Sequence, residues 1–311
     1  MEYRRLGQSG LHVSVAGLGC NNFGMRIDYE AAERVTNAAL DAGVTLFDTA
    51  DVYGQGASEE MLGRALAGRR HEVLIATKFA IPMGDGPMRQ GGSRHWITEA
   101  CEASLRRLGT DYIDLYQMHI PDTHTPIEET LQALDDLVRA GKVRYLGNSN
   151  FKGWQISEAH WTADKHHLTK MISAQNHYNL IERSVETEVV PAANRYGLGI
   201  LPYFPLASGF LTGKYRPGEE TAEGTRLAAW GDRAGGILTE KNFLTLERLE
   251  AWAGDRGHTV LELAIGWLAS QPHVASVISG ATKPEQLQAN VSAVEWKLTP
   301  EEIAEVVSLV A

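Results

Sequence analysis

The chain has 311 residues with an ordinary globular composition (43% hydrophobic, 22% charged), which excludes disorder, and its net charge of −10 disfavours nucleic acid as a partner. No apolar run reaches 18 residues and the first ten residues lack an apolar core, so we expect no membrane-spanning helix, membrane partner or signal peptide. Two cysteines exclude a disulfide framework and favour a cytoplasmic location.

Eight short apolar runs, rich in Val, Ile, Leu and Tyr, alternate along the chain with segments of helical periodicity. Continuous apolar runs of this length are typical of parallel strands that are buried on both faces. The predicted strands span residues 15–19, 44–48, 73–78, 113–119, 144–149, 171–175, 199–205 and 275–279.

Helices are predicted between these strands. Glycine directly after a helix is a common stop, and Gly43, Gly109 and Gly141 fill that position. The predicted helices span residues 29–42, 58–66, 98–108 and 127–140, and two helices beyond the eight units span residues 241–254 and 300–310.

Eight strand–helix units with short connections predict a closed (β/α)8 barrel, or TIM barrel, as a single domain over residues 1–311. An open dinucleotide-binding sheet would carry G-x-G-x-x-G after the first strand, and residues 17–22 do not complete it. Segments 3–6 and 11–15 predict a hairpin across the barrel bottom. The Gly-rich, charged stretch 216–238 is interpreted as an irregular loop, with a lid as our hypothesis.

Four polar side chains fall at or just after successive strand ends, where this fold carries its chemistry. Asp48 ends the second predicted strand and Tyr53 follows it, while Lys78 and His119 end the third and fourth. Each has an ordinary explanation when taken singly: a helix cap, a packed ring, a surface charge or a structural histidine. Their convergence on one barrel mouth favours a catalytic site.

The four residues together predict a phenol that exchanges a proton. Tyrosine titrates near pH ~10, and a buried Lys78 would lower the pKa of Tyr53. Asp48 would pair with Lys78, whose burial alone is costly, and a neutral His119 would orient a carbonyl oxygen. Because no side chain donates a hydride, the site needs a redox cofactor.

Seven segments of the chain resemble the aldo-keto reductases, in order and at the matching strand ends between residues 3 and 290. They are DTADVYG (48–54), TKF (77–79), HIPD (119–122), GNSNF (147–151), QNHYN (175–179), YFPL (203–206) and GATKPEQ (280–286). The loop after the seventh strand is similar to that of bacterial members and of the potassium-channel β-subunit branch. The resemblance implies a (β/α)8 barrel without a metal, and reduction of a small-molecule aldehyde or ketone by NADPH.

The resemblance also implies a role for each of the four residues. Tyr53 would be the general acid that protonates the carbonyl oxygen as the hydride arrives, and Lys78 would lower its pKa. Asp48 would hold Lys78, and His119 would orient the substrate carbonyl.

A set of NADPH-binding residues follows from the same resemblance. Ser149, Asn150 and Gln175 would hold the nicotinamide carboxamide, and Tyr203 would stack on the nicotinamide ring. Lys283 would pair with the 2′-phosphate. Many members carry an arginine at or near the position of Gln286, so in this chain the preference for NADPH over NADH would rest mainly on Lys283. The other implied residues are Pro205, Leu206, Ser208, Gly209, Leu211, Lys214 and Arg226 after the seventh strand, and Gly280, Thr282, Gln286 and Asn290 after the eighth.

Loops at the same mouth supply the candidate substrate pocket. Asn21 and Phe23 follow the first strand, Ile81 follows the third, and Ile120 follows the fourth. A mostly apolar pocket with one polar end suits an uncharged carbonyl better than a phosphorylated sugar.

Three other functions would use some of the same residues. A zinc hydrolase would use Asp48, His119 and His177, but no His-x-His marks the first strand and Lys78 disfavours a metal. A non-catalytic NADP(H)-binding barrel acting as a redox sensor would not need all four catalytic residues. An NAD(P)-dependent sugar or alcohol dehydrogenase would use Tyr53 as base. The sequence leaves natural substrate, reaction direction and oligomeric state open.

Overall fold

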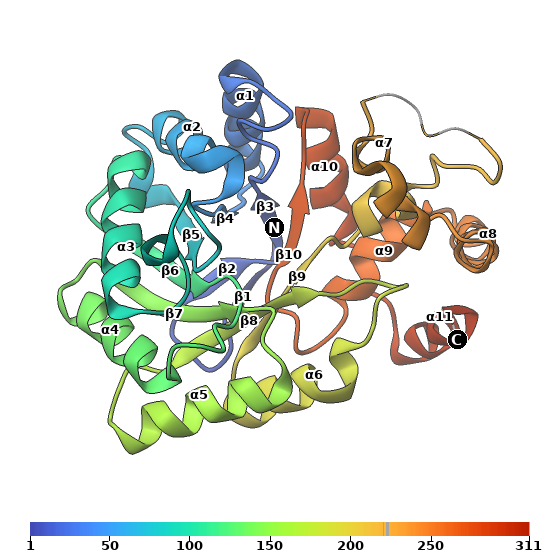
Figure 1. The fold of residues 1–311 in the computed structure, drawn as a ribbon. Helices are drawn as coiled ribbons and strands as arrows, with labels where there is room; N and C mark the ends of the chain where they lie inside the picture. Colours follow the sequence, from blue (N-terminus) through green and yellow to red (C-terminus); the bar gives the residue numbers. More distant parts are fainter. Residues whose placement is uncertain (220, 222–223, 311) are drawn as a thin grey trace.

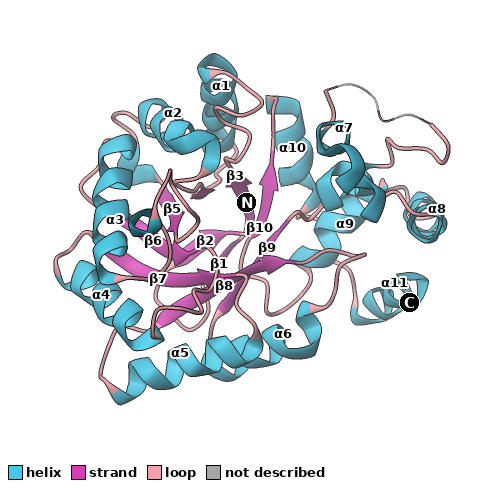
Figure 2. Cartoon of the chain, in the orientation of Figure 1, coloured by secondary structure: helices cyan, strands magenta, loops and turns pink. Residues whose placement is uncertain are grey.

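The chain forms a closed barrel of eight parallel strands surrounded by helices (Figures 1 and 2). The computed structural model describes residues 1–219, 221 and 224–310. The strands follow each other around the barrel in chain order, and the last pairs with the first to close it. They are β3 (Ala16–Gly19), β4 (Leu46–Asp48), β5 (Leu74–Phe79), β6 (Ile113–Met118), β7 (Val143–Ser149), β8 (Met171–His177), β9 (Gly199–Tyr203) and β10 (Val277–Gly280).

The predicted (β/α)8 barrel and its eight strands are confirmed, with ends that shift by a few residues. β4 begins two residues later than predicted, because the Thr45 backbone N–H donates to Ser14 Oγ (2.9 Å) instead of entering the sheet. β8 runs two residues further, because its last residue, His177, pairs with Tyr203 of β9.

A small antiparallel hairpin, β1 (Tyr3–Arg5) and β2 (His12–Ser14), lies at the end of the barrel where the strands begin, as predicted. Leu6 and Val13 are fully buried there, in one apolar cluster with Leu46, Leu115 and Leu201 of the barrel strands. Burying a side chain of this size contributes roughly 1.5–3 kcal/mol. The hairpin therefore seals this end and leaves the opposite end as the open mouth.

Helices cover the outside of the barrel, and their apolar faces form the larger core (Figure 2). α3 begins four residues before the predicted start, because Ser93 Oγ accepts a hydrogen bond from the Trp96 backbone N–H (3.3 Å) and caps the helix. It ends at Gly109, whose φ of 62° is the expected left-handed stop. The helices are α1 (Tyr29–Asp41), α2 (Ala57–Ala65), α3 (Arg94–Leu108), α4 (Ile127–Arg139), α5 (Gly153–Lys165), α6 (Val185–Tyr196), α7 (Arg226–Trp230), α8 (Glu240–Gly254), α9 (Val260–Ala269), α10 (Pro284–Ala293) and α11 (Pro300–Val310).

The prediction of an irregular stretch over residues 216–238 is wrong in part. It contains α7, capped by the Thr225 side chain, and a 3₁₀ segment at Gly231–Gly236. Residues 220, 222 and 223 within the stretch lie outside the described residues, and the lid stays a hypothesis. Within the part of the chain that the structure describes, no helix is long and apolar enough to cross a membrane.

Candidate active site

Three neighbouring strands bring the four sequence-predicted catalytic residues to the barrel mouth. Asp48 is the last residue of β4, Lys78 lies next to the end of β5, and His119 directly follows β6. Tyr53 starts the 3₁₀ turn Tyr53–Gly56 that follows β4. Parallel pairing of β4 with β5 and of β5 with β6 fixes their order around the mouth.

Asp48 and Lys78 form an ion pair that is almost fully buried. Lys78 Nζ lies 2.6 Å from Asp48 Oδ2 and donates a second hydrogen bond to the Thr49 carbonyl (2.7 Å). The other carboxylate oxygen accepts from Gln175 Nε2 (2.8 Å) and Gln117 Nε2 (3.3 Å). Burial opposes the charge of Lys78, but Asp48 and then Tyr53 outweigh it, so the net pKa of Lys78 is raised. Lys78 is therefore a permanent cation behind the mouth.

The Tyr53 hydroxyl lies 3.5 Å from Lys78 Nζ, and the ammonium lies 5.0 Å from the ring centroid. Lys78 lowers the pKa of Tyr53, as expected, but the expected net decrease is wrong. Burial raises the pKa of Tyr53 above its ordinary value, and the opposing effect of Lys78 is smaller. The phenol is therefore protonated at neutral pH and stands ready as a proton donor.

His119 faces Tyr53 edge to face, with ring centroids 5.8 Å apart and an interplanar angle of 85°. Burial, and then Lys78, lowers the pKa of His119 to about 3, so the ring is neutral at neutral pH. Its Nδ1 is buried without a hydrogen-bond partner among the described residues. Two hydrogen bonds fix the His119 backbone: its N–H donates to the Phe79 carbonyl (2.9 Å), and its own carbonyl accepts from Asn150 Nδ2 (2.9 Å).

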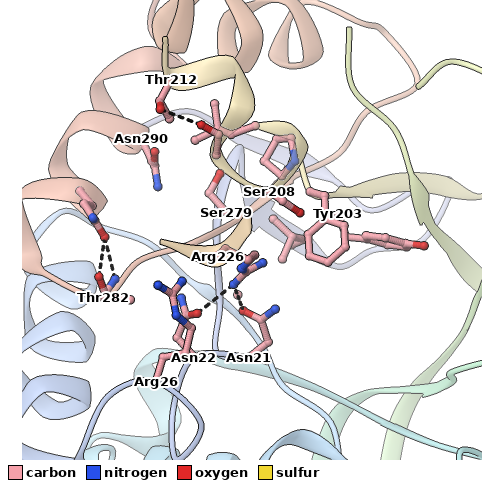
Figure 3. A pocket seen from close by; sticks show the side chains of 18 of the residues that line it. Asn21, Asn22, Arg26, Tyr203, Ser208, Thr212, Arg226, Ser279, Thr282 and Asn290 are labelled. Carbon is pink, nitrogen blue, oxygen red and sulfur yellow. Dashed lines mark hydrogen bonds between the residues drawn. The ribbon is translucent and has the colours of Figure 1, made fainter. Parts of the chain in front are cut away.

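The residues expected around a nicotinamide line a cavity of about 820 Å³ that opens from Tyr53 and His119. Asn150 joins them: its Oδ1 accepts from the Tyr203 hydroxyl (2.8 Å), and its Nδ2 also donates to Ser149 Oγ (3.1 Å). The cavity continues past Thr282 to Asn290, which lies on α10 (Figure 3). Its lining includes every residue of the predicted cofactor set except Leu211.

Four cations line this cavity: Arg26, Lys214, Arg226 and Lys283. Within the described residues none of them forms an ion pair, and the only acids in the lining are Asp48, which is bound to Lys78, and Glu285. In a protein with a net charge of −10, such a concentration of positive charge favours an anionic ligand.

Arg226 is the most enclosed of these cations. Its guanidinium donates to Asn21 Oδ1 (3.1 Å) and Asn22 Oδ1 (2.8 Å) across the cavity (Figure 3). Asn22 is turned toward it because its Nδ2 donates to the Ala281 carbonyl (3.2 Å). Burial, and then the neighbouring Arg26, lowers the pKa of Arg226. Two amide oxygens leave its charge uncompensated, which suits a phosphate.

A strained turn after β9 shapes the middle of the cavity. Ser208 and Gly209 both have positive φ, 59° and 93°. The φ of Gly209 favours glycine, and a Cβ there would lie 3.0 Å from Lys214 Nζ, so the ammonium lies close to this turn. Ser208 Oγ is buried without a hydrogen-bond partner among the described residues. An orphaned hydroxyl close to an ammonium that lacks an ion-pair partner among the described residues fits a bound diphosphate.

At the far end, Thr282 donates its backbone N–H (2.8 Å) and its hydroxyl (3.0 Å) to Gln286 Oε1. Lys283 is exposed beside them, and Asn290 of α10 is buried. This end therefore carries one exposed cation.

Two predicted site residues do not reach the cavity. Phe23 and Leu211 are both fully buried in the core and do not line the cavity, because the loop backbone turns them inward. Ile81 and Ile120 also lie outside the lining, and Asn21 alone of the predicted substrate residues is part of it. The described cavity therefore gives no support to a mostly apolar substrate pocket.

Sequence reasoning missed several residues of the site. They include Gln117 on Asp48, and Asn22, Arg26, Phe204 and Glu285 in the cavity lining. The signal for Gln117 was present, because it lies two residues before His119 and β-strand alternation turns both to the same side. The loop residues had no comparable pattern.

The zinc alternative required Asp48, His119 and His177 to converge. In the structure Asp48 is bound to Lys78, and His177 lies outside the cavity lining. Among the described residues no group of three or more His, Cys, Asp or Glu is arranged to hold a metal ion.

Comparison with known proteins gives consistent matches. The model of the aldo/keto reductase family matches residues 16–311. A probable voltage-gated potassium channel subunit beta of Oryza sativa subsp. japonica is 39% identical over 318 residues, covering 100% of this chain and 97% of the relative. The uncharacterized oxidoreductase YrpG of Bacillus subtilis is 39% identical over 312 residues (97% and 93% covered). The L-glyceraldehyde 3-phosphate reductase of Escherichia coli O157:H7 is 35% identical over 319 residues (98% and 91% covered).

These matches span nearly the whole chain and agree with the barrel that the structure shows. They also cover all four residues that meet at its mouth, from Asp48 to His119. The chain belongs to the aldo/keto reductase family.

Proposed function

We propose that the protein reduces small aldehydes or ketones with NADPH, and that Tyr53 donates the proton. One observation carries the proposal: the Tyr53 hydroxyl lies 3.5 Å from a buried ammonium and beside a neutral histidine, at one end of a cation-lined cavity. Oxidoreductases among the relatives agree with this reaction class.

The residues at the mouth divide the work of carbonyl reduction, in which a hydride adds to carbon and a proton to oxygen. NADPH supplies the hydride when bound. His119, neutral because of its burial, holds the carbonyl oxygen toward Tyr53. Tyr53 donates its hydroxyl proton to that oxygen, and the charge of Lys78 stabilises the phenolate that remains. Asp48 keeps Lys78 in position throughout.

The cavity residues fit the parts of a phosphorylated dinucleotide. At the catalytic end, Tyr203 offers a flat ring to the nicotinamide, with Ser149 and Gln175 near its carboxamide. Arg226 and Lys214 offset the charge of the diphosphate. The remaining residues of this proposal are Asn150, Pro205, Leu206, Ser208 and Gly209 along the cavity, and Gly280, Thr282, Lys283, Gln286 and Asn290 around the adenosine and its 2′-phosphate.

The test is a titration of purified protein with NADPH and with NADH, followed by quenching of the emission of its seven tryptophans. Addition of 4-nitrobenzaldehyde then reports turnover through the absorbance of the reduced cofactor. We expect tighter binding of NADPH and its oxidation by the aldehyde. Binding of neither cofactor would overturn the proposal.

A second candidate is a non-catalytic NADP(H)-binding barrel, and the relatives named as potassium channel β subunits favour it. Tight NADPH binding without turnover of several aldehydes and ketones would select this function.

We also propose a cytoplasmic location, because Cys20 and Cys101 are both free and buried.

A further inference from the structure

His177, which no part of the proposed reaction uses, lies flat behind the ring of Tyr203. The two rings are parallel within 9°, with centroids 5.4 Å apart, and the residues are paired between β8 and β9. Tyr203 lines the cavity, and His177 does not. His177 therefore covers one face of the Tyr203 ring while Tyr203 borders the cavity.

The His177 ring is itself fixed, and its hydrogen bonding can be worked out. Asn179 is fully buried, and its Oδ1 accepts from two backbone N–H groups, those of Ile181 and Glu182 (3.0 Å each). The Asn179 amide nitrogen must then face the Phe204 carbonyl (2.9 Å) and His177 Nε2 (3.2 Å). Nε2 is consequently the acceptor, and the proton of neutral His177 lies on Nδ1.

Neutral His177 is also the form that its surroundings favour. Burial lowers the pKa of His177, and the opposing effect of Glu182 is smaller. Protonation of Nε2 would set its N–H against the Asn179 amide donor. The ring is therefore a neutral, oriented aromatic surface at neutral pH.

Tyr203 has two other contacts, and neither lies parallel to its ring. Its hydroxyl donates to Asn150 Oδ1 (2.8 Å), and Phe204 meets it nearly perpendicular (84°) at 5.2 Å. A hydroxyl contact still lets the ring rotate about its long axis. A parallel neighbour opposes that rotation, because the rings would lose contact area.

We propose that His177 is a positioning residue that holds the Tyr203 ring parallel to the nicotinamide of the bound cofactor. This inference rests on the proposed function, in which Tyr203 stacks on that nicotinamide. His177 contacts two cavity residues, Tyr203 by parallel stacking and Phe204 edge to face (5.7 Å, 89°). Through Tyr203 its effect falls on the nicotinamide half of the cofactor, and we expect the adenosine half to be unaffected.

The test compares two ligands: NADP⁺, and 2′-phosphoadenosine 5′-diphosphoribose, which is the same molecule without nicotinamide. Their dissociation constants are measured by tryptophan fluorescence on wild type, His177→Ala and His177→Phe. His160→Ala is the matched control, because His160 stacks on Tyr196 (4.4 Å, 28°) on helices α5 and α6, and neither residue lines the cavity.

For His177→Ala we expect NADP⁺ to bind roughly two- to tenfold more weakly, the range of an aromatic pair, and the nicotinamide-free ligand to bind as to wild type. His177→Phe keeps a flat ring and should restore most of the NADP⁺ affinity. His160→Ala should bind both ligands like wild type.

Three outcomes would each overturn the positioning role. His177→Ala could weaken both ligands equally, it could leave the NADP⁺ affinity unchanged, or His177→Phe could fail to restore the NADP⁺ affinity. Those results differ from failure of the proposed function, in which wild type itself binds neither ligand.

Discussion

The two ends of the cavity are built differently. At the catalytic end, Asp48, Lys78 and Tyr53 lie on strand ends or the adjoining turn and contact one another. At the phosphate end, Arg226 begins the short helix α7 and Lys214 lies on a loop, with no ion-pair partner for either among the described residues. The first end is electrostatically complete without a ligand, and the second is completed by an anion. We therefore expect changes at the first end to affect stability and chemistry, and changes at the second to affect binding.

The largest expected effect is on folding. Lys78→Met leaves Asp48 buried and unpaired, and should lower the free energy of unfolding by about 3–5 kcal/mol. Urea unfolding at neutral pH measures it. The double variant Asp48→Asn/Lys78→Met removes both charges and should be more stable than Lys78→Met alone; equal or lower stability would show that the pair is not the source of the loss.

The second effect is a pH dependence of stability. His119 has its folded pKa lowered from 6.5 to about 3, so the unfolded chain binds a proton more readily between these values. Its stabilising contribution is full above about pH 6.5 and is lost as the pH falls toward 3. At pH 5 the loss should be roughly 2 kcal/mol relative to pH 7. His119→Gln should lose that much less stability over the same interval, and parallel curves for the two proteins would contradict it.

Residues at strand ends could be predicted from the sequence better than the directions of side chains on loops. Asp48, Lys78 and His119 were predictable because the topology of a closed barrel carries all strand ends to one mouth. Phe23 and Leu211 were not, because loop backbone angles such as the positive φ at Ser208 decide which side chains face the cavity. The direction of the Tyr53 pKa also escaped prediction, because it depends on how far burial outweighs Lys78.

Arg226→Gln tests the phosphate end. It removes the charge that we propose faces the diphosphate, which NADPH and NADH share. Both cofactors should bind roughly tenfold to hundredfold more weakly, the range of a charged hydrogen bond. Titration of each cofactor by tryptophan fluorescence measures the change. A loss confined to NADPH would move Arg226 to the 2′-phosphate.

The smallest expected effect is at Lys283, which is exposed and therefore screened by water. Lys283→Ala should weaken NADPH roughly twofold to fivefold and leave NADH unchanged, because NADH has no 2′-phosphate. Lys297→Ala, at an exposed lysine outside the cavity lining, is the control for lost surface charge. Equal weakening of NADPH and NADH would contradict the assignment.

The central claim is that Tyr53 gives the proton while the rest of the cavity binds the cofactor. The most direct measurement takes wild type and Tyr53→Phe through one NADPH titration and one assay with 4-nitrobenzaldehyde. We predict equal dissociation constants and a turnover in Tyr53→Phe lower by about 10²–10⁴-fold, the usual contribution of a positioned acid. Near-normal turnover by Tyr53→Phe would contradict the account.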